Sequence, residues 1–135
     1  ALHGVQVTLL SQCGNRKAET PTPRRIIGRL SGGAVRLHDG PIPGELIVAE
    51  GLESALSASD GLAAPSWSAL TAGNLARFTP PDGLARLIIA ADRGPAGEAA
   101  ADTLKTRLSG HRLQTEIAFA PDRYPDWNDW ARRTL

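Results

Sequence analysis

The sequence is poor in the residues from which several kinds of site are built. It has one cysteine, Cys13, and three histidines, His3, His38 and His111, which fall at no ligand spacing. A single thiol excludes an intramolecular disulfide framework and any zinc site made of several thiolates, and it suits a reducing, cytoplasmic setting. Methionine is absent, even at position 1. We therefore expect the chain to start inside a longer reading frame or to be processed.

Aromatic residues and long apolar runs are also scarce. Aromatics make up 4% of the 135 residues, so the core must be built from Leu, Ile, Val and Ala. The longest aliphatic run, residues 87–91, is far shorter than the ~20 residues that span a bilayer, and no signal-peptide pattern is present. The sequence contains neither a P-loop nor a nucleophile elbow. These absences favour one globular domain without a membrane partner.

Charge is distributed unevenly along the chain, although the net charge is only +1. Residues 1–40 carry a net charge of +4, from six basic and two acidic residues, and residues 41–135 carry −3, from nine basic and twelve acidic residues. A basic arm joined to an acidic core suits a protein that binds a polyanion and performs metal chemistry on it. The alternative is a solvated loop with ordinary charge scatter. The six basic residues are Arg16, Lys17, Arg24, Arg25, Arg29 and Arg36.

The first 44 residues are predicted to be a β-rich extension. Apolar residues alternate with polar ones over 5–9, the period of a half-buried strand. Two further apolar segments, 26–30 and 34–37, flank Ser31-Gly32-Gly33, which favours a hairpin turn between them. A linker rich in proline and glycine, 40–44, then separates this extension from the rest.

From residue 45 onward, strands alternate with helices. Strands are predicted over 46–49, 66–70, 87–91 and 116–120, and helices over 52–59, 74–78, 97–108 and 126–135. The runs 46–49 and 87–91 are apolar without alternation, as in strands buried on both faces. The pattern predicts an α/β fold with a mainly parallel sheet flanked by helices.

Acidic residues follow the predicted strands. Glu50 comes directly after 46–49, Asp92 comes directly after 87–91, and Asp126 and Asp129 follow the last strand. In parallel sheets, ligands bind beyond the carboxyl ends of the strands, and an oxygen-only cluster there favours Mg²⁺ or Mn²⁺. Each acid also has a local alternative: Glu50 and Asp92 as turn residues, and Asp126 with Asp129 as a helix cap.

Three segments resemble a known family. The segments are 46–56 (LIVAEGLESAL), 87–97 (LIIAADRGPAG) and 125–129 (PDWND). In this order they resemble the motifs of the Toprim domain in the primase-like proteins of plasmids, phages and other mobile elements. Residues 4–37 resemble the region that precedes Toprim in those proteins. The resemblance implies a Rossmann-like Toprim fold over 45–135 with the β-rich extension 1–44 before it.

The resemblance also implies an activity. A DNA primase-type nucleotidyltransferase joins nucleoside triphosphates to a primer on a single-stranded DNA template, with Mg²⁺ or Mn²⁺ as cofactor. Glu50 would act as general acid/base or as a ligand, and Asp92, Asp126 and Asp129 would be metal ligands. Arg24, Arg25, Arg29 and Arg36 would contact nucleic acid, and a zinc-binding domain and a helicase would be partners in the same polypeptide.

One position departs from the family pattern. The second motif has two aspartates in the family, whereas here the second position is Gly94. This leaves open a catalytically degenerate module that binds nucleic acid. A Toprim nuclease or strand-breaking enzyme is a further alternative, with Tyr124 as the only tyrosine in the chain.

Overall fold

The structure is a computed structural model that describes residues 2–41, 44–121 and 124–134. The chain forms two compact units, Ala1–Ser31 and Gly32–Leu135. Within the described ranges, no helix has both the length and the apolar character needed to cross a bilayer.

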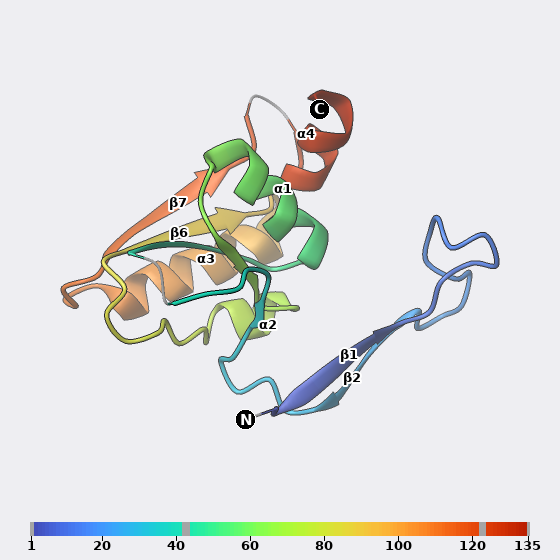
Figure 1. The fold of residues 1–135 in the computed structure, drawn as a ribbon, viewed down its shortest axis with the longest axis horizontal. Coiled ribbons are helices and arrows are strands. Elements are labelled where there is room, and N and C mark those ends of the chain that lie inside the picture. Colours follow the sequence, from blue (N-terminus) through green and yellow to red (C-terminus); the bar gives the residue numbers. More distant parts are fainter. Residues whose placement is uncertain (1, 42–43, 122–123, 135) are drawn as a thin grey trace. The chain divides into compact units, whose positions relative to one another are not determined.

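The first unit is a two-stranded ribbon (Figure 1). Strands β1 (Gly4–Thr8) and β2 (Arg24–Gly28) pair antiparallel, with Val5 opposite Ile27. The predicted strand at 5–9 is therefore confirmed, but Val5 and Ile27 stay 45% and 65% exposed. Within this unit, the apolar pattern forms a ribbon and does not form a core.

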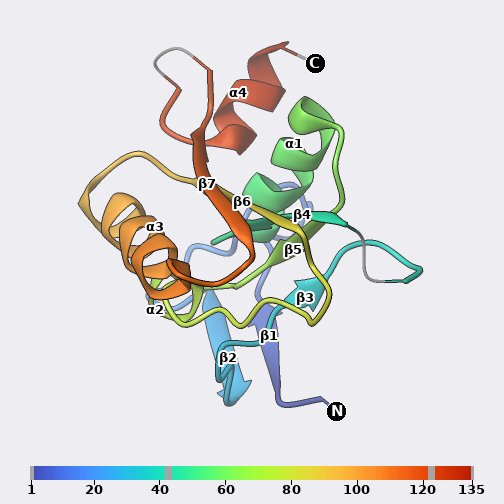
Figure 2. The same cartoon turned by 90° about the vertical axis from the view of Figure 1, so that its left-hand side faces the viewer.

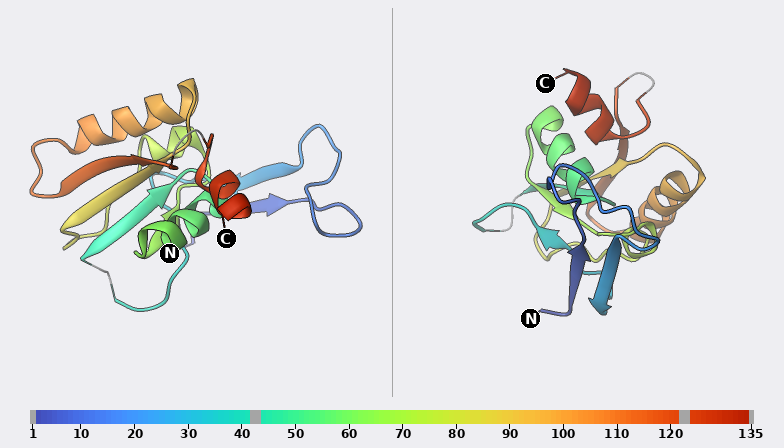
Figure 3. Two further views of the ribbon diagram at one scale, coloured as in Figure 1. Left: turned by 90° about the horizontal axis from the view of Figure 1, so that it is seen from above. Right: turned by 90° about the vertical axis from the view of Figure 1, so that its right-hand side faces the viewer.

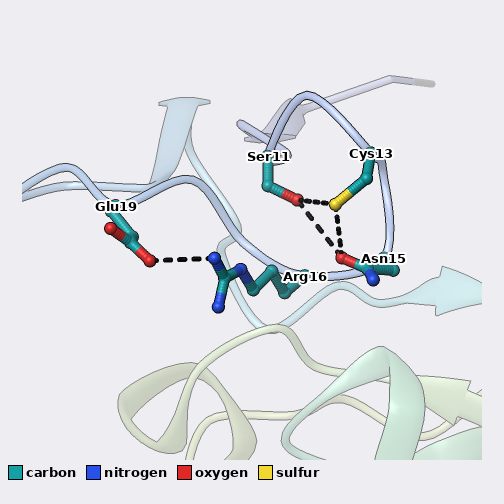
Figure 4. Close-up of polar contacts among 5 residues, drawn as sticks. All are labelled: Ser11, Cys13, Asn15, Arg16 and Glu19. Atoms are coloured by element: carbon teal, nitrogen blue, oxygen red, sulfur yellow. Dashed lines mark hydrogen bonds and ion pairs between the residues drawn. The ribbon is translucent and has the colours of Figure 1, made fainter.

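Polar contacts order the loop between β1 and β2 (Figure 4). The Cys13 thiol donates to Asn15 Oδ1 at 2.8 Å and lies 3.3 Å from the Ser11 hydroxyl. Hydrogen bonding by Ser11 is the main reason why the pKa of Cys13 is lowered. Arg16 and Glu19 form an exposed ion pair of 3.1 Å, and exposed pairs of this kind contribute little to stability.

The second unit contains a five-stranded sheet in the order β3-β5-β4-β6-β7. β5, β4, β6 and β7 are mutually parallel, and β3 is antiparallel at the edge beside β5. After their charged first residues, Glu45 and Arg86, the two central strands are buried, which explains their unbroken apolar sequence from there on. The strands are β3 (Val35–Arg36), β4 (Glu45–Ala49), β5 (Ser66–Ser68), β6 (Arg86–Ala91) and β7 (Gln114–Phe119).

Helices cover both faces of this sheet (Figures 2 and 3). α2 (Ala72–Leu75) and α3 (Pro95–Leu108) pack on one face, where Leu104 meets the alternate side chains of β4 and β6. α1 (Leu52–Leu62) and α4 (Trp127–Thr134) pack on the other face. The Rossmann-like α/β prediction is confirmed.

The predicted hairpin around Ser31-Gly32-Gly33 is wrong. β2 pairs with β1, and β3 pairs with β5, so the segments flanking this turn do not pair with each other. The Asn74 side chain explains part of the difference, because its amide oxygen accepts from Gly32 N and its nitrogen donates to Gly33 O, both at 2.8 Å. These bonds join Gly32 and Gly33 to α2 within the second unit. The division after residue 44 stays a prediction of where the Toprim-like module begins.

Candidate functional site: an acidic edge of the sheet

Two of the predicted acids follow neighbouring strands. Glu50 comes directly after β4 and Asp92 directly after β6. The strands are parallel and in register, with Ala49 opposite Ala90. Both carboxylates therefore lie at the same carboxyl edge of the sheet, where α/β proteins bind ligands.

Asp92 has the most perturbed environment of this group. Burial is the largest cause, and the charges of Asp126 and Glu50 add to it, so that the pKa of Asp92 is raised to about 6. A hydrogen bond from Ser54 acts in the opposite direction. A partly buried carboxylate that is repelled by two others is an arrangement that a cation would relieve.

Arg93, the residue after Asp92, bonds to residues close to Asp126 in the chain. The Arg93 backbone amide donates to Pro125 O at 2.7 Å, and its guanidinium donates to Ala120 O at 3.0 Å and Tyr124 O at 3.1 Å. Asp126 Oδ1 accepts from the Asp129 amide at 2.7 Å, as an N-cap of α4 does. The predicted cap is therefore present. Asp126 can therefore cap α4 and also contribute its charge to the acidic edge.

Asp129 is placed differently from the other acids. It lies in the first turn of α4, and its Oδ1 is 3.4 Å from Arg133 Nε. The charges that act on Asp92 are those of Asp126 and Glu50. Among the described residues, no group of three or more His, Cys, Asp or Glu side chains is placed to hold a metal.

The donor chemistry nevertheless fits a hard cation. Mg²⁺ is commonly bound through one or two carboxylates, with waters and substrate phosphates completing its shell. Glu50, Asp92 and Asp126 carry oxygen donors only, and the negative charges that act on Asp92 favour a cation bound there through one or two carboxylates.

Two glycines shape the turn between β6 and α3. A Cβ at Gly97 would lie 2.4 Å from the Asp92 carbonyl oxygen, so only glycine allows α3 to approach the strand end this closely. Gly94 is the N-cap of α3 with φ +117° and ψ 163°, a conformation that is essentially confined to glycine. Its amide donates to Glu98 Oε1 at 3.0 Å. Gly94, which stands where the family motif has its second aspartate, therefore has a backbone conformation that disfavours any side chain.

Two serines support the acidic edge and were not predicted from the sequence. Ser54 Oγ donates to Asp92 Oδ1 at 3.3 Å. The fully buried Ser68 donates to Glu50 O at 3.0 Å and accepts from the Leu70 amide at 3.3 Å. Leu70 has a positive φ of 71°, so the Ser68 hydroxyl also stabilises a strained turn beside Glu50. The signals in the sequence were the place of Ser54 within the segment 46–56 and a serine, Ser68, in a buried strand.

The predicted basic residues are divided between the two units. Arg24 and Arg25 are on β2, and Arg29 follows that strand. Arg36 is on β3 in the second unit, where its guanidinium lies 4.8 Å from the centre of the Trp67 ring. Arg36 is thus part of a cation–π contact at the sheet edge.

The chain is similar to known proteins in sequence and in fold. Residues 45–135 match the family described as "Toprim domain". Two solved structures are similar, each with a TM-score of 0.63: the primase fragment of the bacteriophage T7 primase-helicase protein and a DNA primase domain from Pseudomonas aeruginosa. Their identities to this chain are 18% and 12%, over 96% and 98% of it. No match was found among curated protein sequences.

The chain spans 57% of the phage fragment and 47% of the Pseudomonas domain, about half the length of each. At these identities the likeness concerns the fold. It confirms the predicted kind of sheet and the helices on both of its faces.

Proposed function

This chain belongs to the Toprim family, and from that premise we propose that it is the metal-dependent nucleotidyl-transfer core of a DNA primase-like replication protein. The observation that carries the proposal is the acidic edge. Burial and the charges of Asp126 and Glu50 raise the pKa of Asp92 to about 6, in a chain whose family match covers residues 45–135. Strongly perturbed carboxylates at a strand end are typical of functional sites.

Asp92 and Asp126 are the proposed ligands of Mg²⁺ or Mn²⁺, with Asp129 as a weaker third. A bound divalent cation would offset the charge of the nucleotide phosphates and lower the pKa of the attacking 3′-hydroxyl. Glu50 is the proposed general acid/base or a further ligand. The Arg93 contacts to Pro125 and Ala120 support the proposal, because they join the residue after Asp92 to the residue before Asp126 and to the end of β7.

The proposed nucleic-acid contacts are Arg24, Arg25 and Arg29 in the N-terminal unit, with Arg36 at the edge of the sheet. Basic residues that neutralise phosphates release counterions, so this binding should weaken steeply with salt. The proposed partners are a single-stranded DNA template and nucleoside triphosphates, together with a zinc-binding domain and a helicase of the same polypeptide. A cytoplasmic replication protein of a phage or other mobile element is the setting that we propose.

A catalytically degenerate module that binds nucleic acid is the second candidate. It is favoured by Gly94, where the family motif has an aspartate and where the backbone conformation disfavours one. A Toprim nuclease is a weaker alternative, which metal-dependent nicking of plasmid DNA would support.

Calorimetric titration with Mn²⁺, comparing the wild type with Asp92→Asn, separates the first two candidates. The catalytic proposal predicts saturable binding that the substitution removes. Absence of binding up to millimolar Mn²⁺ would favour the degenerate module. In the full-length protein, primer synthesis that survives both Glu50→Gln and Asp92→Asn would show that the residue roles are wrong.

A further inference from the structure

A hydroxyl group connects the two motifs of the acidic edge. Ser54 lies in the first turn of α1, four residues after Glu50, and is only 6% exposed. Its Oγ donates to Asp92 Oδ1 at 3.3 Å, a contact between residues 38 positions apart. A hydroxyl that donates to an ionised carboxylate makes a charge-assisted bond, and at 3.3 Å this one is long for its type.

The packing of α1 fixes where this hydroxyl lies. Ala55 and Ala58 are fully buried and place the helix against the sheet, in the cluster that includes Ile47 of β4. The helix begins after Gly51, at the end of β4. Ser54 is therefore held by a rigid element and is directed at the end of the neighbouring strand, as expected of a residue that supports a site.

The chemistry of Ser54 also suits the site. The Ser54 hydroxyl donates to one carboxylate oxygen of Asp92 and so limits the orientations that this carboxylate can take. The hydroxyl is neutral, so it orients a carboxylate without adding to the repulsion at the edge. Groups that orient metal-ligating carboxylates through hydrogen bonds strongly affect metal affinity.

We propose that Ser54 is a positioning residue, which orients the Asp92 carboxylate for cation binding through the hydrogen bond from its hydroxyl. The inference rests on the proposed function, because it assumes that Asp92 is a metal ligand. Ser54 acts through Asp92 and need not itself contact the cation or the substrate.

The test compares Ser54→Ala and Ser54→Thr with Ser57→Ala. Ser57 is on the same helix and is similarly buried, at 8% exposed, so its truncation controls for the loss of a buried hydroxyl. Calorimetric titration with Mn²⁺ at neutral pH should show binding weakened about tenfold in Ser54→Ala. Ser54→Thr, which keeps the hydroxyl, should recover most of the affinity, and Ser57→Ala should bind as the wild type does.

The recovery by Ser54→Thr separates a positioning role from a general loss of packing, because only the hydroxyl is common to serine and threonine. Unchanged Mn²⁺ affinity in Ser54→Ala, or equal losses in Ser54→Ala and Ser57→Ala, would overturn the inference. Failure of the proposed function gives a different result, because Mn²⁺ binding by the wild type would then be absent or unaffected by Asp92→Asn.

Discussion

Charged side chains are arranged differently at the two ends of the central sheet. At the amino end, Arg86 of β6 pairs with Glu45 of β4 and, at 2.6 Å, with Glu116 of β7. At the carboxyl end, Asp92 follows the same strand β6, but the neighbouring charges that act on it are the carboxylates of Asp126 and Glu50. The charges at the amino end compensate one another, whereas the charges that act on Asp92 at the carboxyl end are both negative.

This difference indicates which end is functional. Ion pairs across strands hold β4, β6 and β7 together and need no ligand. Repelling carboxylates at a partly buried edge make the metal-free fold less stable, so an external cation is the natural source of compensation. Substitutions at the two ends of the sheet test this contrast.

The largest expected effect is at Gly97, at the carboxyl end. Gly97→Ala would bring a Cβ within 2.4 Å of the Asp92 carbonyl oxygen, so α3 or the end of β6 must move. We expect a loss of about 3 kcal/mol in the free energy of unfolding, together with loss of Mn²⁺ binding. Urea unfolding and calorimetry measure both quantities. Gly73→Ala in α2 is the matched control, because its Cβ would meet nothing within 4 Å. Equal behaviour of the two variants would contradict the close approach.

The second largest loss of stability is expected when the aspartate of the family motif is introduced at position 94. Gly94→Asp restores the family residue, but it places a side chain at φ +117°. We expect a loss of about 2 kcal/mol in unfolding free energy and no gain in Mn²⁺ affinity. Gly94→Ala has the same strain without the carboxylate and separates the two causes. Tighter Mn²⁺ binding by Gly94→Asp at unchanged stability would show that the turn tolerates the aspartate.

Asp92→Asn should change the free energy of unfolding less than the glycine substitutions do, and it should raise it. The pKa of Asp92 is raised from 3.8 to about 6, so the folded state binds more protons than the unfolded state between these two pH values. Stability of the metal-free wild type therefore falls as pH rises through this window, and the loss is complete above it. After a discount for partial exposure, we expect Asp92→Asn to gain about 1 kcal/mol at pH 7.5 and little at pH 3.5. Urea unfolding at both pH values measures this. A destabilised variant at pH 7.5 would mean that the carboxylate is already compensated in the metal-free protein.

The sequence predicts this fold well because its signals are local. The runs 46–49 and 87–91 are unbroken apolar segments, and each is followed by an acid. Those two features suffice to predict buried parallel strands and an acidic edge, and the structure has both strands where they are expected.

The parts that sequence reasoning missed depend on distant partners. Nothing near Ser54 in the chain indicates Asp92, which lies 38 residues away. The pairing of β3 with β5 depends on where Ser66–Ser68 lies, and the apolar pattern of 34–37 fits a hairpin with 26–30 equally well. The conformation of Gly94 likewise becomes known only when α3 is placed against β6.

The smallest change in stability is expected for Arg86→Met, at the amino end of the sheet. The substitution keeps the aliphatic part of the side chain and leaves Glu45 and Glu116 without the cation between them. Because the three side chains are 35–41% exposed, water screens much of the interaction, and we expect a modest fall in the urea midpoint that shrinks at high salt. Mn²⁺ affinity should not change, since the substitution is at the opposite end of β6. Arg112→Met, at an exposed position before β7, is the control and should alter neither quantity. If Arg86→Met instead reduced Mn²⁺ affinity as strongly as Ser54→Ala, the two ends of the sheet would be coupled, and the division between a structural end and a functional end would be wrong.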